Sequence, residues 1–173
     1  MDTNAGNGDP PAPRDILRVS TCETPETLAP ASVLFDRYRR HHGESDGGER
    51  TLGWLTEMVH SRMLTVYTAS SASQDERPPL GLATSHAMPA SLVMGRFWQL
   101  RDLYVLPEFR RRGTAAALVS AVREDAVAAG ATRLSLVTGL DNRPALDLYR
   151  RLGFEPVAGL ASLSLDLVPR TTT

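Results

Sequence analysis

Apolar residues recur along the chain with two different spacings, and these spacings predict its secondary structure. A spacing of three and four residues, typical of an amphipathic helix, predicts helices over residues 25–42, 49–61, 114–129 and 142–151. Short apolar runs rich in β-branched and aromatic residues predict strands, over residues 14–20, 63–69, 80–88, 97–106, 133–138, 154–157 and 160–167. An antiparallel opening followed by alternating strands and helices indicates an α/β (α+β) protein.

The most informative stretch runs over residues 97–117, where a strand leads through an arginine-rich turn into a helix. Pro107 closes the strand, because its ring fixes φ and it has no N–H to donate. Gly113 precedes a helix whose first four N–H groups have no partner within the helix. Such a cluster of N–H groups binds an anion, above all a phosphate. Together with the three arginines at 110–112, this turn predicts a site for a phosphorylated cofactor.

Two familiar phosphate-binding motifs are excluded. A dinucleotide-binding turn needs Gly-x-Gly-x-x-Gly and a Walker loop needs Gly-Lys-Ser/Thr, whereas this chain contains no lysine. The turn instead resembles the acyl-CoA pyrophosphate loop of the GCN5-related N-acetyltransferase (GNAT) superfamily. The family pattern Gln/Arg-x-x-Gly-x-Gly/Ala matches RRRGTA at 110–115, after the lead-in DLYVLPE at 102–108. A second segment, NRPALDLYRRLGF at 142–154, resembles the later helix and turn of the family.

The resemblance covers roughly residues 14–167 and implies a fold and a reaction. The fold is the GNAT fold, a central mixed, mostly antiparallel sheet of six to seven strands flanked by about four helices. The reaction is transfer of an acetyl group from acetyl-CoA to a primary amine, which attacks the thioester directly. The lead-in and the segment FDRY at 35–38 look most like the branch that acts on amino acids, polyamines or histone tails.

The resemblance also implies a set of residues that hold acetyl-CoA. Backbone N–H groups of the turn would bind the pyrophosphate, and the end of the preceding strand would pair with the pantetheine arm. The expected cofactor-binding residues are Leu103, Tyr104, Val105, Arg110, Arg111, Arg112, Gly113, Thr114, Ala115, Asn142 and Tyr149.

The catalytic residues expected from the resemblance are Tyr149 and Asp102. A phenol with a pKa near 10 stays protonated at neutral pH and can donate to the leaving thiolate; Tyr149 is equally suited to a core aromatic position. Asn142 suits both a bond to the cofactor and a helix cap. Asp102 suits a base for the amine, or an anchor for neighbouring backbone.

The resemblance implies that the first two helices and their loop form the acceptor side, next to the strand at 80–88. The candidate substrate-binding residues are Tyr38, His42, Arg101 and His86. Polyamine-type relatives often carry a carboxylate immediately before the lead-in aspartate, whereas this chain has Arg101. An arginine there favours an acceptor with its own carboxylate, such as an amino acid. His86 also suits a packing role without contact to substrate.

The composition limits which kinds of binding partner are expected. Nineteen basic and twenty acidic side chains give a formal net charge of −1, so no global charge favours nucleic acid or an anionic membrane. The four histidines show no metal-binding spacing, so no metal is expected. No run approaches the ~20 apolar residues of a membrane span and the N-terminus lacks a signal pattern, so cytoplasmic localisation is the expectation.

The expected domain organisation is a disordered tail over 1–13, one acetyltransferase domain over 14–168 and a frayed end over 169–173. A homodimer is possible on this pattern, because alternating Leu163, Leu165 and Leu167 suit a strand shared with a partner or, equally, an inner face. Three functions remain open: a small-molecule N-acetyltransferase, a protein or peptide acetyltransferase, and a non-catalytic acyl-CoA sensor.

Overall fold

The computed structural model describes residues 16–72, 78–159, 161–165 and 167. The chain divides into two compact units, Met1–Val137 and Thr138–Thr173. The tail expected over 1–13 and the frayed end expected over 169–173 lie outside the described residues. The single domain expected over 14–168 stays a prediction.

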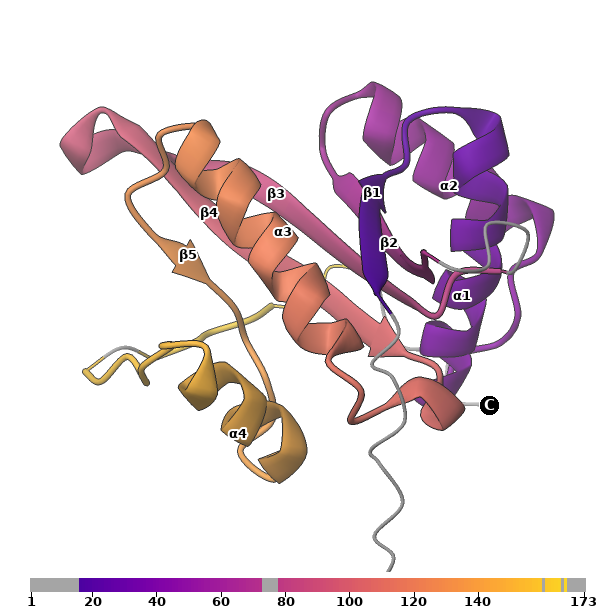
Figure 1. The fold of residues 1–173 in the computed structure, drawn as a ribbon. Coiled ribbons are helices and arrows are strands. Elements are labelled where there is room, and N and C mark those ends of the chain that lie inside the picture. Colours follow the sequence, from indigo (N-terminus) through magenta and orange to yellow (C-terminus); the bar gives the residue numbers. More distant parts are fainter. Residues whose placement is uncertain (1–15, 73–77, 160, 166, 168–173) are drawn as a thin grey trace, which may run out of the picture. The chain divides into compact units, whose positions relative to one another are not determined.

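The first unit contains one five-stranded sheet. The strands β1 (Leu17–Thr21), β2 (Thr65–Ser71), β3 (Gly81–Ala90), β4 (Gly95–Val105) and β5 (Leu134–Ser135) lie in this order across it. The first four pair antiparallel, and β5 pairs parallel to β4. The predicted mixed, mostly antiparallel sheet is therefore confirmed, and β3 and β4 form its long central hairpin (Figure 1).

Two helices, α1 (Pro25–His41) and α2 (Glu49–His60), connect β1 to β2. The first begins with a capping box in which Thr24 and Thr27 satisfy backbone N–H groups at the helix start, with a proline in the first turn. Its apolar side enters a core that contains Leu28, Leu34 and Leu55 at 3% exposure or less.

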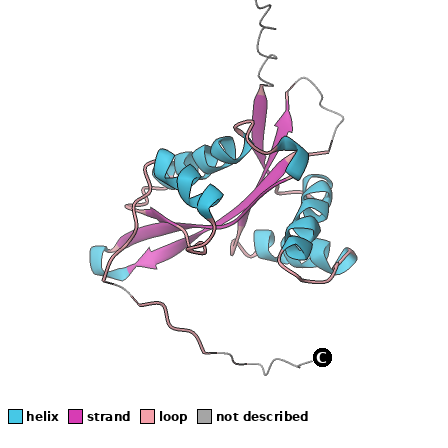
Figure 2. Ribbon diagram, turned by 90° about the horizontal axis from the view of Figure 1, so that it is seen from below, coloured by secondary structure: helices cyan, strands magenta, loops and turns pink. Residues whose placement is uncertain are grey.

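A third helix, α3 (Thr114–Ala128), connects β4 to β5 and buries Leu118 and Val122 completely. Neighbouring strand residues point to opposite faces: Val66 belongs to the core with α1, whereas the hydroxyl of Tyr67 donates to Asp125 of α3 at 2.8 Å. The helix α3 therefore covers the face opposite to α1 and α2, as Figure 2 also shows.

The second unit contains the helix α4 (Arg143–Arg151). Asn142 caps it, since its side chain accepts a hydrogen bond from the N–H of Ala145 at 3.4 Å. The helix ends before Gly153, which has a φ of 88°, and the rings of Tyr149 and Phe154 pack edge to face.

The predicted count of six to seven strands is wrong for the described residues. The described part of 154–167 forms no strand, and Leu163, Leu165 and Leu167 are 83–92% exposed. These leucines therefore do not form the inner face that their alternation allows. Alternation defines which side chains would share a face, but a strand also needs the backbone hydrogen bonds of a neighbouring strand. The predicted strand at 133–138 shortens to Leu134–Ser135 for the same reason.

Candidate active site

The turn between β4 and α3 places a row of unpaired N–H groups at a helix N-terminus. A short 3-10 turn (Pro107–Phe109) follows β4, and Arg111 and Gly113 then take positive φ values of 61° and 91°. No carbonyl of the described residues accepts a hydrogen bond from the N–H groups of residues 111–116. These N–H groups and the positive end of the α3 dipole form an anion site.

The arginines of this turn differ in what they contact. The Nε–H of Arg110 donates to the carbonyl of Val105 at 3.0 Å, and its guanidinium lies 5.9 Å from the centre of the Tyr104 ring. The guanidinium of Arg112 lies over Phe109. All three arginines are exposed, but the bond to Val105 holds Arg110 against the end of β4, whereas Arg111 and Arg112 are available to an anion.

Beyond its short pairing with β5, one edge of β4 has no partner strand among the described residues. The pairing with β5 stops at Gln99. The N–H of Leu106 donates to Leu80, on the β3 side, and the backbone groups of successive strand residues point alternately to either side. Those of Leu103 and Val105 therefore point to the open edge. Because the Val105 carbonyl accepts from Arg110, the Val105 N–H and both groups of Leu103 remain for an added strand-like ligand.

A bulge in β4 lies next to this open edge. Thr84 pairs with Asp102 and Ser85 with Leu100, so Arg101 is the additional residue. The hydroxyl of Thr84, which is completely buried, donates to the Asp102 carboxylate. Arg101 itself is exposed. The bulge thus brings an oriented carboxylate and an exposed guanidinium to one place.

The two charged residues of this bulge, Arg101 and Asp102, both shift the pKa of His86. Burial lowers the pKa of the half-buried imidazole below its ordinary value, the positive charge of Arg101 lowers it further, and Asp102 partly opposes both. The predicted residues Arg101, Asp102 and His86 therefore form one electrostatic group, with a neutral imidazole at neutral pH.

The last turns of α1 bring the other two predicted acceptor residues to β4. The Tyr38 ring lies 6.2 Å from that of Tyr104 and 4.7 Å from that of His42. His41 also reaches Tyr104, at 6.1 Å. The guanidinium of Arg110 also lies near the Tyr104 ring. These side chains of α1 are therefore close to the turn that precedes α3.

The predicted residues Asn142 and Tyr149 belong to the second unit. Asn142 performs the capping role that the sequence allowed, and its amide also contacts Thr138 at 3.4 Å. Tyr149 is 9% exposed, and burial raises its pKa above the ordinary value. Its phenol therefore stays protonated at neutral pH.

Sequence reasoning missed Thr84, the partner of Asp102. A threonine in a strand carries no signal of its own, and the contact depends on the register of β3 against β4, which the bulge shifts. It also missed Asp36, a buried carboxylate on α1, because an aspartate within an amphipathic helix is usually a solvated residue.

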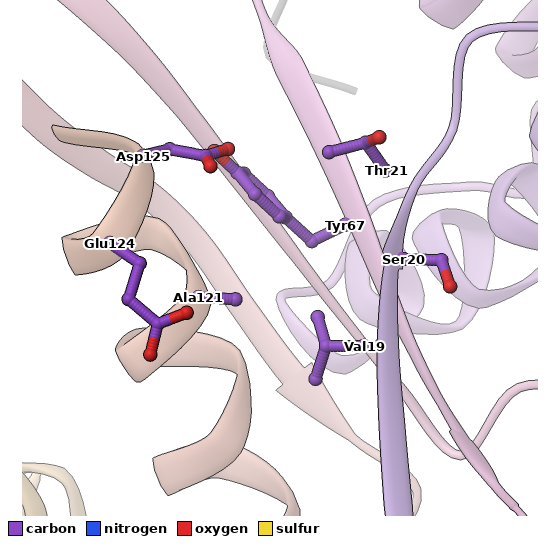
Figure 3. A pocket seen from close by; sticks show the side chains of 7 residues that line it. All are labelled: Val19, Ser20, Thr21, Tyr67, Ala121, Glu124 and Asp125. Carbon is purple, nitrogen blue, oxygen red and sulfur yellow. The ribbon is translucent and has the colours of Figure 1, made fainter. Parts of the chain in front are cut away.

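Two cavities lie elsewhere in the first unit. One, of about 380 Å³, lies between β1, β2 and α3, with Asp125 and Tyr67 on its wall pointing toward one another (Figure 3). The other, of about 540 Å³, includes Cys22 and Arg18. Neither is lined by a predicted site residue. In the described part of the chain there is no group of three or more potential metal ligands, and no helix is long and apolar enough to cross a membrane.

An anion site at a helix N-terminus beside an open strand edge suits the pyrophosphate and the amide-bearing arm of an acyl-CoA. The chain matches the model of the acetyltransferase (GNAT) family over residues 32–154, more than half of its length. It belongs to this family and is an acetyl-CoA-dependent N-acetyltransferase.

The relatives agree with this membership. The chain is similar to the uncharacterized N-acetyltransferase YhfO of Bacillus subtilis, with 25% identity over 151 residues that cover 87% of this chain and 98% of the relative. A crystal structure of a probable acetyltransferase has a TM-score of 0.80 at 26% identity, covering 88% of this chain and 99% of that one. The aminoglycoside acetyltransferase AAC(6')-Iy, in complex with a bisubstrate analogue, CoA-S-monomethyl-acetylneamine, shares the fold at 18% identity (TM-score 0.72, covering 87% and 99%).

Proposed function

We propose that this enzyme transfers the acetyl group to the primary amine of a small molecule, by direct attack of the amine on the thioester. The observation that carries the proposal is the bulge in β4, where Asp102, Arg101 and His86 interact beside an open strand edge. Within one short stretch of the sheet they place a carboxylate, a guanidinium and a neutral imidazole. A small polar amine has the right chemistry for such a site.

The cofactor-binding residues of the first unit fit acetyl-CoA. The unpaired N–H groups of residues 111–116 would hold the pyrophosphate, with Arg111 and Arg112 for the charged oxygens. The open backbone groups of Leu103 and Val105 would pair with the amides of the pantetheine arm. Bound there, acetyl-CoA supplies an activated thioester carbonyl. We assign Arg110 a supporting role, because its Nε–H is already bonded to Val105.

A protonated acceptor amine must first lose a proton, because only the neutral amine has a lone pair to attack the thioester. We propose that Asp102 accepts this proton, either directly or through the neutral imidazole of His86. The hydroxyl of Thr84 orients the carboxylate of Asp102. Tyr38 and His42 are assigned to the wall that orients the amine. The bond from nitrogen to the acetyl carbon forms as the carbon–sulfur bond breaks, and the leaving thiolate takes a proton.

For that last proton we assign Tyr149, with Asn142 as a second contact to the cofactor. The hydroxyl of Tyr149 has the protonation state required, since burial raises its pKa. Asn142 can bond a cofactor only with the part of its amide that the cap of α4 leaves available. Both assignments extend the family resemblance of the segment 142–154.

The nature of the acceptor follows from Arg101. Its exposed guanidinium favours an amine that carries a carboxylate, as in an amino acid. The complex of AAC(6')-Iy with an acetylneamine analogue supports small polyfunctional amines more generally. A protein or peptide amine is the second candidate, favoured by the wide exposure of the α1–α2 connection at residues 41–46. Membership of the branch that acts on amino acids, polyamines or histone tails is part of the same proposal.

Two further expectations stay within the proposal. A cytoplasmic location is supported by the single cysteine, which needs no oxidising compartment. A homodimer is supported by the exposed, alternating leucines at 163, 165 and 167, which suit a shared strand edge.

The test is thiol release from acetyl-CoA with L- and D-amino acids, spermidine, kanamycin A and short peptides. Calorimetric binding of CoA is the control. We expect binding of CoA and turnover with the small amines, with a higher kcat/KM for those that carry a carboxylate. Turnover with peptides alone would establish the second candidate, and CoA binding without turnover on any of these amines would contradict the proposed acceptor class.

A further inference from the structure

The most highly coordinated carboxylate of the described chain lies on α1 and not in the bulge. Asp36 is buried and accepts hydrogen bonds from the hydroxyl of Thr51 at 2.6 Å, the N–H of Gly47 at 3.1 Å and the N–H of Gly48 at 3.0 Å. Arg39 adds an ion pair at 3.3 Å. A buried carboxylate with this many donors is ionised: burial opposes ionisation, but the hydrogen bonds lower the pKa below its ordinary value.

These bonds tie the start of α2 to α1. The N–H groups of Gly47 and Gly48 belong to the connection that leads into α2, and the hydroxyl of Thr51 belongs to the first turn of the helix. The carboxylate also places a negative charge near the positive end of the helix dipole, which is a favourable interaction. One carboxylate on α1 thus holds the place where α2 begins.

The connection between the helices fits closely around this carboxylate. A Cβ on Gly47 would lie 2.2 Å from the Thr51 hydroxyl and 2.7 Å from the Arg39 guanidinium. Gly48 has a φ of 50°, a conformation that glycine adopts readily. Both glycines are therefore required if the backbone is to reach Asp36.

A continuous row of aromatic side chains leads from α2 to the proposed acceptor side. The ring of Trp54 on α2 stacks on Phe35 at 5.5 Å, and Phe35 contacts Tyr38 at 5.7 Å. Tyr38 in turn packs with Tyr104 on β4 at 6.2 Å. A displacement of α2 relative to α1 would therefore move Tyr38, and with it the wall assigned to the acceptor.

From this geometry we propose that Asp36 is a positioning residue for the acceptor amine: by bonding the connection before α2 and the first turn of α2, it fixes the helix pair that presents Tyr38 and His42. The proposal rests on the function proposed above. Asp36 does not touch the reacting atoms, so its loss affects binding of the acceptor and leaves binding of acetyl-CoA unchanged.

The experiment compares Asp36→Asn and Thr51→Val with two controls. Thr51→Ser keeps the hydroxyl that bonds Asp36. Glu49→Gln removes an exposed carboxylate from the same end of α2. Kinetic constants are measured for acetyl-CoA and for L-methionine, spermidine and kanamycin A, and thermal unfolding confirms that each variant is folded.

For Asp36→Asn we expect the acceptor KM to rise about tenfold, with the KM for acetyl-CoA and the kcat changed less than about twofold. Thr51→Val changes the acceptor KM in the same direction, and Thr51→Ser restores it. If Asp36→Asn is unfolded, Thr51→Val decides, since it leaves the carboxylate in place. An unchanged acceptor KM, or equal effects on acetyl-CoA, overturns the role of Asp36 alone. No thiol release by the unaltered enzyme with any of these amines overturns the proposed function as well.

Discussion

The Nε–H of Arg110 donates a hydrogen bond of 3.0 Å to the carbonyl of Val105. The same guanidinium lies against the ring of Tyr104, so the first arginine of the turn closes back onto the strand that precedes it. The turn is therefore held in place by one of its own cations. The two arginines that follow, Arg111 and Arg112, are available for the cofactor.

Replacement of Arg110 by lysine tests this division of roles. Lysine keeps the charge but loses the planar group that bonds Val105 and lies 5.9 Å from the centre of the Tyr104 ring. A lost hydrogen bond to a charged donor is worth about 1.5–3 kcal/mol, so we expect CoA to bind Arg110→Lys at least about tenfold more weakly by calorimetry. Arg112→Lys is the matched control, for which we expect a change below about threefold. CoA binding to Arg110→Lys as tight as to the unaltered enzyme would show that Arg110 acts through its charge alone.

Gly113 tests the conformation of the turn separately from its charge. A Cβ at Gly113 meets no atom within 4 Å, so any effect of Gly113→Ala comes from its φ of 91° and not from a steric clash. An L-residue in the left-handed region costs about 1–2 kcal/mol, and we expect a corresponding fall in stability together with weaker CoA binding. Gly53→Ala is the control, since Gly53 lies within α2 with the same open surroundings; there alanine stabilises by about 1 kcal/mol. Chemical unfolding and calorimetry measure both effects, and a neutral Gly113→Ala would contradict the strained turn.

The sequence predicted this turn well because its signals are local. Pro107, Gly113 and the apolar spacing from Ala115 onward act within a few residues, and the structure has the helix beginning at Thr114 as they indicate. The helices α1, α2 and α4 agree with the prediction to within one residue at each end, for the same reason.

The contacts that depend on register were not predictable. The pairing of Thr84 with Asp102 requires the one-residue shift that makes Arg101 a bulge, and neither strand signals this shift by itself. The bonds from Gly47 and Gly48 to Asp36 join residues more than ten positions apart. The prediction of a closing hairpin was wrong for a different reason. The alternation at 160–167 indicates which side chains would share a face of a strand, but it does not identify a strand with which this segment could pair.

Tyr149 gives a test of the proposed proton donor. Tyr149→Phe removes only the hydroxyl, and general acid catalysis typically contributes about 10²–10⁴-fold, so we expect kcat to fall by at least about a hundredfold with unchanged CoA binding. Because burial raises the pKa of Tyr149, the unaltered enzyme keeps this donor to above pH 10. Tyr67→Phe is the control: it removes a buried hydroxyl that bonds Asp125, which affects stability and not kcat. Full activity of Tyr149→Phe would remove Tyr149 from the mechanism.

The charge on His86 gives a test of the acceptor site that needs no substrate. Arg101 lowers the pKa of His86 and Asp102 raises it, so Arg101→Gln should move the titration of the imidazole to higher pH, and Asp102→Asn to lower pH. NMR titration of the four histidines measures both shifts. Arg96→Gln is the control, since Arg96 is an exposed arginine near the start of the same strand.

The same shift determines how His86 affects stability. Its folded pKa lies below the unfolded value of about 6.5, so the unfolded chain binds the proton first as the pH falls. Neutral His86 therefore contributes stability that is fully present above pH 6.5 and is lost as the pH falls through the folded pKa. In Arg101→Gln the folded pKa moves back toward the unfolded one, so the loss of stability between neutral and mildly acidic pH becomes smaller. Urea unfolding at several pH values measures this difference; a steeper loss in Arg101→Gln than in the unaltered protein would show that Arg101 and His86 do not interact as the bulge requires.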